Sequence, residues 1–159
     1  MAQVFMGSNT LKMAESKFCP VLIIPPGGEY KDLQNVLLTT DLKNVVSTTP
    51  SAPIKKILKT FKLKLHIVNV NTDHYVALTE EHEAEKQHLK EMFAEFNPEF
   101  YFLHLFDVDD AINQFVEDKN IDLTIAIHKD HGYIHKIFNA SHTKNLVYQS
   151  TVPVLVIHE

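Results

Sequence analysis

Short apolar, β-branched runs alternate with amphipathic segments through most of the chain, and this alternation restricts the possible folds more than any other feature. The runs are residues 35–40, 66–70, 99–106, 123–127 and 154–157. Between them lie segments with apolar residues at helical spacing, for which we expect helices at 53–62, 79–96, 107–120 and 143–149. Strands that alternate with helices predict an α/β fold, with a parallel sheet, right-handed crossovers and helices on both faces.

Two residues indicate where predicted helices begin. Pro53 suits the first position of a helix, and Asp107 resembles an N-cap. Residues 42–51 are polar, and we expect an irregular loop there. The charged run 79–90 is typical of a solvated helix face.

The size and charge of the chain limit its class. Its 159 residues suffice for one domain with a core and an appendage. The net charge of −5 disfavours binding to nucleic acid or to an anionic membrane surface. The single cysteine, Cys19, cannot form an internal disulfide, and no secretory pattern is evident. We therefore expect a cytoplasmic protein. Cys19 has no CxxC partner or basic surroundings, and its place just before the apolar run 21–24 leads us to expect that it is buried.

The first 27 residues look like a separate piece. Leu11, Ala14 and Phe18 have helical spacing, and the apolar run 21–24 follows them. Residues 25–28 read Pro-Pro-Gly-Gly, which predicts a linker at about 25–31.

An internal repeat connects this piece with the end of the chain. A shift of 133 residues places 7–24 on 140–157 without a gap, and it matches Pro20 with Pro153 and Val21-Leu22 with Val154-Leu155. Chance similarity between apolar strands is the alternative explanation. The matching polar and proline positions favour a duplication.

Several motifs in this order resemble those of the universal stress protein (UspA-like) family. They are Thr39-Thr40-Asp41 after the first strand of the domain, Asp122-Leu123 at the fourth, Ala140-Ser141 before the last helix, and the closing run 152–157. The resemblance covers one domain, residues 28–159. Residues 1–27, with Gly7-Ser8 and the run 19–24, resemble the final helix and strand of a preceding repeat. The chain therefore looks like the C-terminal part of a tandem universal stress protein.

The resemblance implies a three-layer Rossmann-like fold of the adenine nucleotide alpha hydrolase type. Its five-stranded parallel sheet would have the order 3-2-1-4-5, with binding at the carboxyl ends of strands 1 and 4 and dimerisation through strand 5. It also predicts that the N-terminal strand pairs antiparallel with strand 5, in an intrachain pseudo-dimer or in a homodimer formed by exchange. The residues concerned are Val21, Leu22, Ile23 and Ile24 in one strand and Val154, Leu155, Val156 and Ile157 in the other.

The phosphate-binding loop expected after strand 4 is strongly changed. Nucleotide-binding members of the family carry G-x2-G-x9-G-(S/T), whose glycines let backbone amides approach phosphate. When this motif is aligned with the chain, its three glycine positions are occupied by Ile127, Asp130 and Ala140. Ser141, at the final S/T position, is the part of the motif that the chain keeps. A carboxylate about 4 Å from a phosphate charge is repelled by roughly 4 kcal/mol at an effective dielectric near 20. We therefore expect a degenerate nucleotide site, no cofactor, and a non-enzymatic protein that acts through binding and assembly.

The alternative is that the chain retains an AMP or ATP site with a non-standard phosphate loop and hydrolyses the nucleotide slowly. The candidate contacts are Thr39, Asp41, Val70, Ile127, Asp130, Ala140, Ser141 and Thr143. Asp41 and Val70 match positions that contact nucleoside in binding members. From the sequence alone, Asp41 either keeps such a contact or binds nearby backbone in a turn, and Val70 is expected in the core.

The histidines offer a second alternative, a metal-binding module. The chain has ten of them, and His128, His131, His135 and His142 lie in and after the same loop. Imidazole and carboxylate suit zinc or nickel, with His128, His131 and His135 as candidates, but the spacing matches no strong metal signature. Structural or solvated roles are favoured. A weak anion site formed by His128, Lys129 and His131 is also open, and no feature identifies a downstream protein partner.

Overall fold

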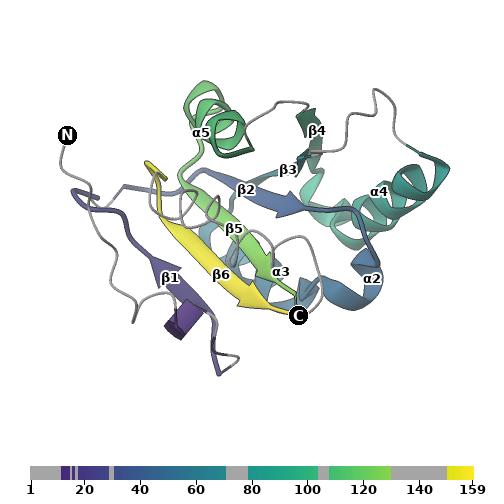
Figure 1. Ribbon diagram of the computed structural model, residues 1–159, viewed down its shortest axis with the longest axis horizontal. Coiled ribbons are helices and arrows are strands. Elements are labelled where there is room, and N and C mark those ends of the chain that lie inside the picture. The colour runs from purple at the N-terminus through teal and green to yellow at the C-terminus, as the bar shows by residue number, and fades with distance from the viewer. Residues whose placement is uncertain are drawn as a thin grey trace.

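The computed structural model describes residues 12–14, 16, 18–28, 31–70, 79–103, 108–129 and 150–159. These residues form a six-stranded sheet in the order β1-β6-β5-β2-β3-β4 (Figure 1). The strands are β1 (Val21–Ile23), β2 (Asn35–Thr40), β3 (Lys64–Val70), β4 (Glu99–Leu103), β5 (Leu123–His128) and β6 (Val154–His158). All neighbours from β6 to β4 are parallel, and β1 is antiparallel to β6. The predicted order 3-2-1-4-5, with an extra antiparallel strand at the last position, is confirmed.

Helices cover both faces of the sheet, as expected for a three-layer fold. On one face, α3 (Ser51–Phe61) and α4 (Glu80–Met92) pack Ile54, Leu58 and Leu89 into the larger core cluster. On the other face, α5 (Val108–Asp118) packs its apolar stripe into a second cluster. Successive side chains of β2 divide between these clusters because strand residues alternate between faces. Continuous apolar runs therefore form the central strands.

The amino-terminal ends of β2 and β5 are joined by the side chain of Asp122. Its Oδ2 atom accepts hydrogen bonds from the backbone N–H groups of Gln34 and Asn35, each at 2.9 Å. This bond explains why an aspartate precedes β5, since it fixes the register of two neighbouring strands.

The pairing of β1 with β6 has an internal symmetry. Leu22 lies opposite Leu155, while Val21 and Ile23 lie opposite Val156 and Val154. These are residues that the 133-residue shift relates to one another, so the register has a local two-fold axis at Leu22 and Leu155. The pairing predicted for Val21–Ile24 is confirmed for its first three residues.

The N-terminal piece differs from expectation in three details. Ile24 lies beyond β1, and Phe18, which was expected at helical spacing with Ala14, lies in a turn with an exposed fraction of 96%. Cys19 is exposed, which contradicts the expectation of burial. Both Phe18 and Cys19 lie in the turn that leads to the outermost strand of the sheet, where no described strand covers them.

Two helical segments also differ from the sequence-based expectation. A short helix, α2 (Val45–Thr48), forms within the region expected to be irregular, and its Val45 is buried. Helix α3 begins at Ser51, two residues before Pro53. Proline is tolerated there because the N–H groups of a helix's first turn need no partner within the helix.

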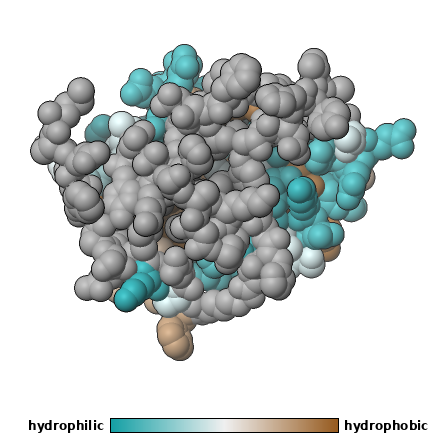
Figure 2. All heavy atoms as spheres, viewed as in Figure 1, coloured by the Kyte–Doolittle hydropathy of each residue, from teal (hydrophilic) through white to brown (hydrophobic). Residues whose placement is uncertain are grey.

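Helix α4 presents the solvated face that its charges predicted. Thr79 caps it by accepting a bond of 3.2 Å from the His82 N–H group. Hydrophilic side chains gather over α4 in the space-filling view (Figure 2), and η1 (Ala94–Phe96) follows it. Among the described residues, no helix is long and apolar enough to cross a membrane.

Candidate functional site

The carboxyl ends of β2 and β5 form the candidate site. The chain runs from β2 to β3 and β4 on one side, whereas β5 and β6 lie on the other, so the strand order reverses between β2 and β5. Ligands of open α/β sheets bind at such reversal points. Asp41 directly follows β2 and Lys129 directly follows β5.

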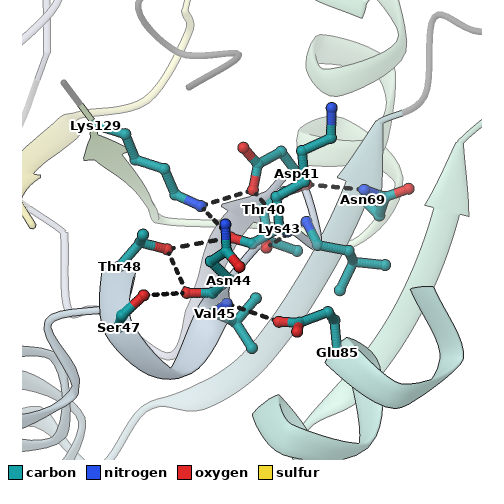
Figure 3. Close-up of polar contacts among 11 residues, drawn as sticks. Thr40, Asp41, Lys43, Asn44, Val45, Ser47, Thr48, Asn69, Glu85 and Lys129 are labelled. Atoms are coloured by element: carbon teal, nitrogen blue, oxygen red, sulfur yellow. Dashed lines mark hydrogen bonds and ion pairs between the residues drawn. The ribbon is translucent and has the colours of Figure 1, made fainter. Parts of the chain in front are cut away.

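A buried ion pair joins the carboxyl ends of β2 and β5 (Figure 3). The Nζ atom of Lys129 lies 2.7 Å from Oδ1 of Asp41 and donates a second bond, of 2.9 Å, to the carbonyl oxygen of Lys43. The exposed fractions of the Lys129 and Asp41 side chains are 7% and 6%. The two charges are thus neutralised within the protein and largely removed from water.

The two carboxylate oxygens of Asp41 differ in their surroundings. Oδ1 also accepts a bond of 3.1 Å from the backbone N–H of Lys43. Oδ2 is buried and has no hydrogen-bond partner among the described residues. Asp41 therefore makes the local turn that one interpretation of the sequence predicted, and it adds a long-range ion pair.

The loop after β2 is held in an unusual backbone conformation. Leu42 and Asn44 have φ angles of 53° and 48°, in the left-handed region that non-glycine residues rarely adopt. The Leu42 N–H donates to Oγ1 of Thr40 at 3.1 Å. Glu85, from α4, accepts a bond of 2.7 Å from the Val45 N–H at the start of α2. These contacts and the Lys129 bond to Lys43 together hold the turn.

Neighbouring polar groups on the strands are used internally. Asn69, on β3, donates to the carbonyl oxygen of Thr40 at 3.0 Å. The hydroxyl of Thr39 donates to the carbonyl of Ile125 over 3.4 Å, which is a weak bond. Both side chains are buried and join adjacent strands.

Two histidines lie side by side at the ends of β5 and β6. His128 and His158 are in register, and their ring centroids are 5.1 Å apart. His128 is buried, and Nε2 of His158 lies 2.9 Å from the carbonyl oxygen of Ala14. Within the described part of the chain, no three metal-ligating side chains come together.

A separate titratable cluster lies away from this site, on β3 and β4. Burial lowers the pKa of His66, against an opposing effect of Glu99. Hydrogen bonds from Lys64 and Tyr101 lower the pKa of Glu99 to about 2, and the bond to Glu99 raises the pKa of Tyr101 to about 12. The ring of His66 stacks on Tyr101 with centroids 5.9 Å apart. The cluster joins the edge strand β4 to the sheet.

The described part of the candidate site contains Thr39, Asp41, Ile127 and His128. Ile127, which aligns with the first glycine of the phosphate loop, is a buried residue of β5 opposite Ile157. Val70 is the last residue of β3. The other candidates lie outside the described residues: Asp130, Ala140, Ser141, Thr143, His131, His135 and His142, with Asp107.

Sequence reasoning missed the partner of Asp41. Lys129 was assigned to a possible anion site, whereas its ammonium group binds a carboxylate. A usable signal existed, since the predicted strand order makes β2 and β5 neighbours, and Asp41 and Lys129 each follow one of them directly. The contact of Glu85 with Val45 had no such signal, because α2 itself was not expected.

Comparison with known proteins gives one family match. The model of the Universal stress protein family matches residues 57–158. No curated protein sequence matches the chain.

Solved structures match over different lengths. A universal stress protein in complex with cAMP has a TM-score of 0.60 and 17% identity, with 80% of this chain and 98% of that chain covered. A universal stress protein from Archaeoglobus fulgidus in complex with dAMP has a TM-score of 0.50 and 10% identity, covering 80% and 99%. Another, from Archaeoglobus fulgidus DSM 4304, has a TM-score of 0.63 and 19% identity, covering 97% of this chain and 55% of that one. These likenesses show the fold, and the present chain spans about half the length of the last protein.

Proposed function

Because the chain belongs to the universal stress protein family, we propose that it is a non-enzymatic member that acts through binding and assembly and whose nucleotide site is degenerate. The observation that carries this proposal is the buried ion pair between Asp41 and Lys129. It occupies the carboxylate that a nucleoside would contact.

The position of this pair disfavours a bound nucleoside. A ligand donor that binds Oδ1 of Asp41 must compete with the Lys129 ammonium group at 2.7 Å and with the Lys43 N–H at 3.1 Å. Displacing the ammonium group leaves a second buried charge without its partner, which typically costs several kcal/mol. This cost is absent where the carboxylate is free.

The strand β5 disfavours a bound phosphate in a different way. Ile127 lies where a glycine would bring backbone amides close to phosphate, and its side chain is part of the core. Removing a glycine from such a position limits how closely the backbone can approach a ligand. In the alignment, Asp130 replaces the second glycine with a residue whose negative charge would repel phosphate.

The assembly part of the proposal rests on β1 and β6. The symmetric register at Leu22 and Leu155 resembles an interface between two related units, here within one chain or formed by exchange between chains. The match of 97% of this chain to 55% of a longer universal stress protein agrees with a tandem arrangement. Pairing with β1 also covers an edge of β6 that would otherwise favour aggregation.

Isothermal titration of the purified protein with ATP, ADP and AMP tests the degenerate site directly. We expect no saturable heat at micromolar ligand. Micromolar binding with a defined stoichiometry would contradict the proposal.

A second candidate function is a retained AMP or ATP site with a changed phosphate loop. Its support is the structural likeness to proteins solved with cAMP and dAMP. Mass spectrometry of small molecules released from freshly purified protein distinguishes the two candidates. Stoichiometric adenine nucleotide would favour the second.

A further inference from the structure

Two oxygen atoms accept hydrogen bonds from a primary ammonium group at the carboxyl ends of β2 and β5. The Lys129 Nζ atom lies 2.7 Å from Oδ1 of Asp41 and 2.9 Å from the carbonyl oxygen of Lys43. Both are normal lengths for bonds from a charged nitrogen to oxygen. Because both side chains of the ion pair are more than nine-tenths buried, these bonds form with little competition from water.

A further acceptor remains at the same place. Oδ2 of Asp41 is buried and has no partner among the described residues. Leaving a buried acceptor unpaired is unfavourable, so the site has more capacity to accept hydrogen bonds than Lys129 uses. An ammonium group has three N–H donors and suits such a set of acceptors.

The chemistry of these oxygen atoms selects one class of ligand. A carboxylate and a carbonyl are hydrogen-bond acceptors, so they favour a cationic donor and disfavour phosphate. Calcium needs about six to eight oxygen ligands and magnesium about six. Asp41 and Lys43 do not supply such a set, whereas two or three acceptors are enough for an ammonium group.

We propose that the carboxyl ends of β2 and β5 are a binding site for a primary alkylammonium group, which the chain fills with its own Lys129. This inference rests on the proposed function, because it names the class of ligand that the site accepts in place of a nucleotide. Lys129 is then the residue that determines specificity, and a lysine side chain or a polyamine is the kind of group that the site accepts.

Chemical rescue of Lys129→Ala tests the proposal. The substitution removes three carbon atoms and the ammonium group, which together correspond to n-propylammonium. We expect this ion to stabilise the variant in a saturable manner in urea unfolding. At ten times its dissociation constant, it should lower the unfolding equilibrium constant about 11-fold.

Matched controls separate binding from a general effect of salt. Tetramethylammonium at the same concentration is a cation without N–H donors and should not stabilise Lys129→Ala. Lys59→Ala removes the ammonium group of another ion pair, Lys59 with Glu95 at 2.8 Å, but those side chains are 61% and 45% exposed. We expect neither this variant nor Lys129→Met, whose side chain fills the space, to respond to n-propylammonium.

The double variant Asp41→Asn with Lys129→Ala should lose most of the rescue, because the carboxylate is the main acceptor. The wild-type protein should not respond, because a tethered ammonium group has a high effective concentration. If Lys129→Ala fails to fold alone, recovery of folded protein on dilution from urea into each salt gives the same comparison.

Two results would overturn the proposal. One is that n-propylammonium and tetramethylammonium stabilise Lys129→Ala to the same extent, or that neither of them stabilises it. The other is stabilisation by AMP in place of the amine. Failure of the proposed function is a separate result, since it requires nucleotide binding by the wild-type protein.

Discussion

Replacing Lys129 with methionine should destabilise the protein more than any change to its exposed ion pairs. Methionine keeps an unbranched side chain but removes the ammonium group. At 2.7 Å and an effective dielectric near 20, the attraction between Lys129 and Asp41 is roughly 6 kcal/mol, which the desolvation of both groups largely offsets. Without Lys129, the Asp41 carboxylate stays buried with only the Lys43 N–H as a described donor. We expect a loss of about 3–5 kcal/mol in the free energy of unfolding.

Urea unfolding followed by far-ultraviolet circular dichroism measures this loss, and the chain has no tryptophan for fluorescence. The midpoint should fall without a change in the m-value, and the melting temperature should fall by roughly 6–20 °C. Lys59→Met is the control, because exposed pairs contribute at most about 1 kcal/mol.

A double-mutant cycle separates the ion pair from other effects of the substitution. Asp41→Asn and Lys129→Met should together cost less than the sum of the two single losses, since the double variant leaves no buried charge unpaired. A Lys129→Met variant within about 0.5 kcal/mol of the wild type, or strictly additive losses, would refute the reasoning.

Two further predictions concern His66 and β1. Burial lowers the pKa of His66 in the folded protein, so below about pH 6.5 the unfolded chain binds the proton more readily and stability should fall as the pH drops. Relative to His66→Gln, wild-type stability should therefore fall as the pH drops below about 6.5, while Glu99 stays charged; a pH-independent difference would contradict this. Deleting residues 1–27 should uncover the edge of β6 and cause self-association in light scattering, whereas an unchanged, well-behaved truncation would count against a covering role for β1.

The strands, the helices and the parallel pairing could be predicted from local patterns, whereas the order of the strands was implied by the family resemblance. Continuous apolar runs such as 35–40 specify central strands that are covered on both faces, and helical segments between them favour parallel neighbours. The position of β1 beside β6 was implied by the resemblance to tandem family members, together with a repeat in which Val21-Leu22 matches Val154-Leu155. The apolar runs are local to each strand, whereas the repeat compares two segments 133 residues apart.

The loop after β2 could not be predicted in the same way. Helix α2 forms in a polar segment because Val45 is buried and Glu85, forty residues away, accepts its N–H bond. The left-handed conformation of Leu42 depends on contacts that no local propensity indicates. Cys19 was expected to be buried because it precedes an apolar run, but that run became the outermost strand and Cys19 is exposed.

The sequence by itself determined the alternation of strands and helices, and its resemblance to the universal stress protein family implied the sheet order and the antiparallel position of the N-terminal strand. The same resemblance aligns Ile127, Asp130 and Ala140 with the glycines of the family's phosphate loop. Only the tertiary structure decided what became of Asp41. The sequence left two roles open for Asp41, a local turn, which was favoured, and a nucleoside contact, and it offered Lys129 only as part of a possible anion site. The ion pair joins residues 88 positions apart, because parallel pairing brings the ends of β2 and β5 together and burial removes the water that would otherwise solvate both charges.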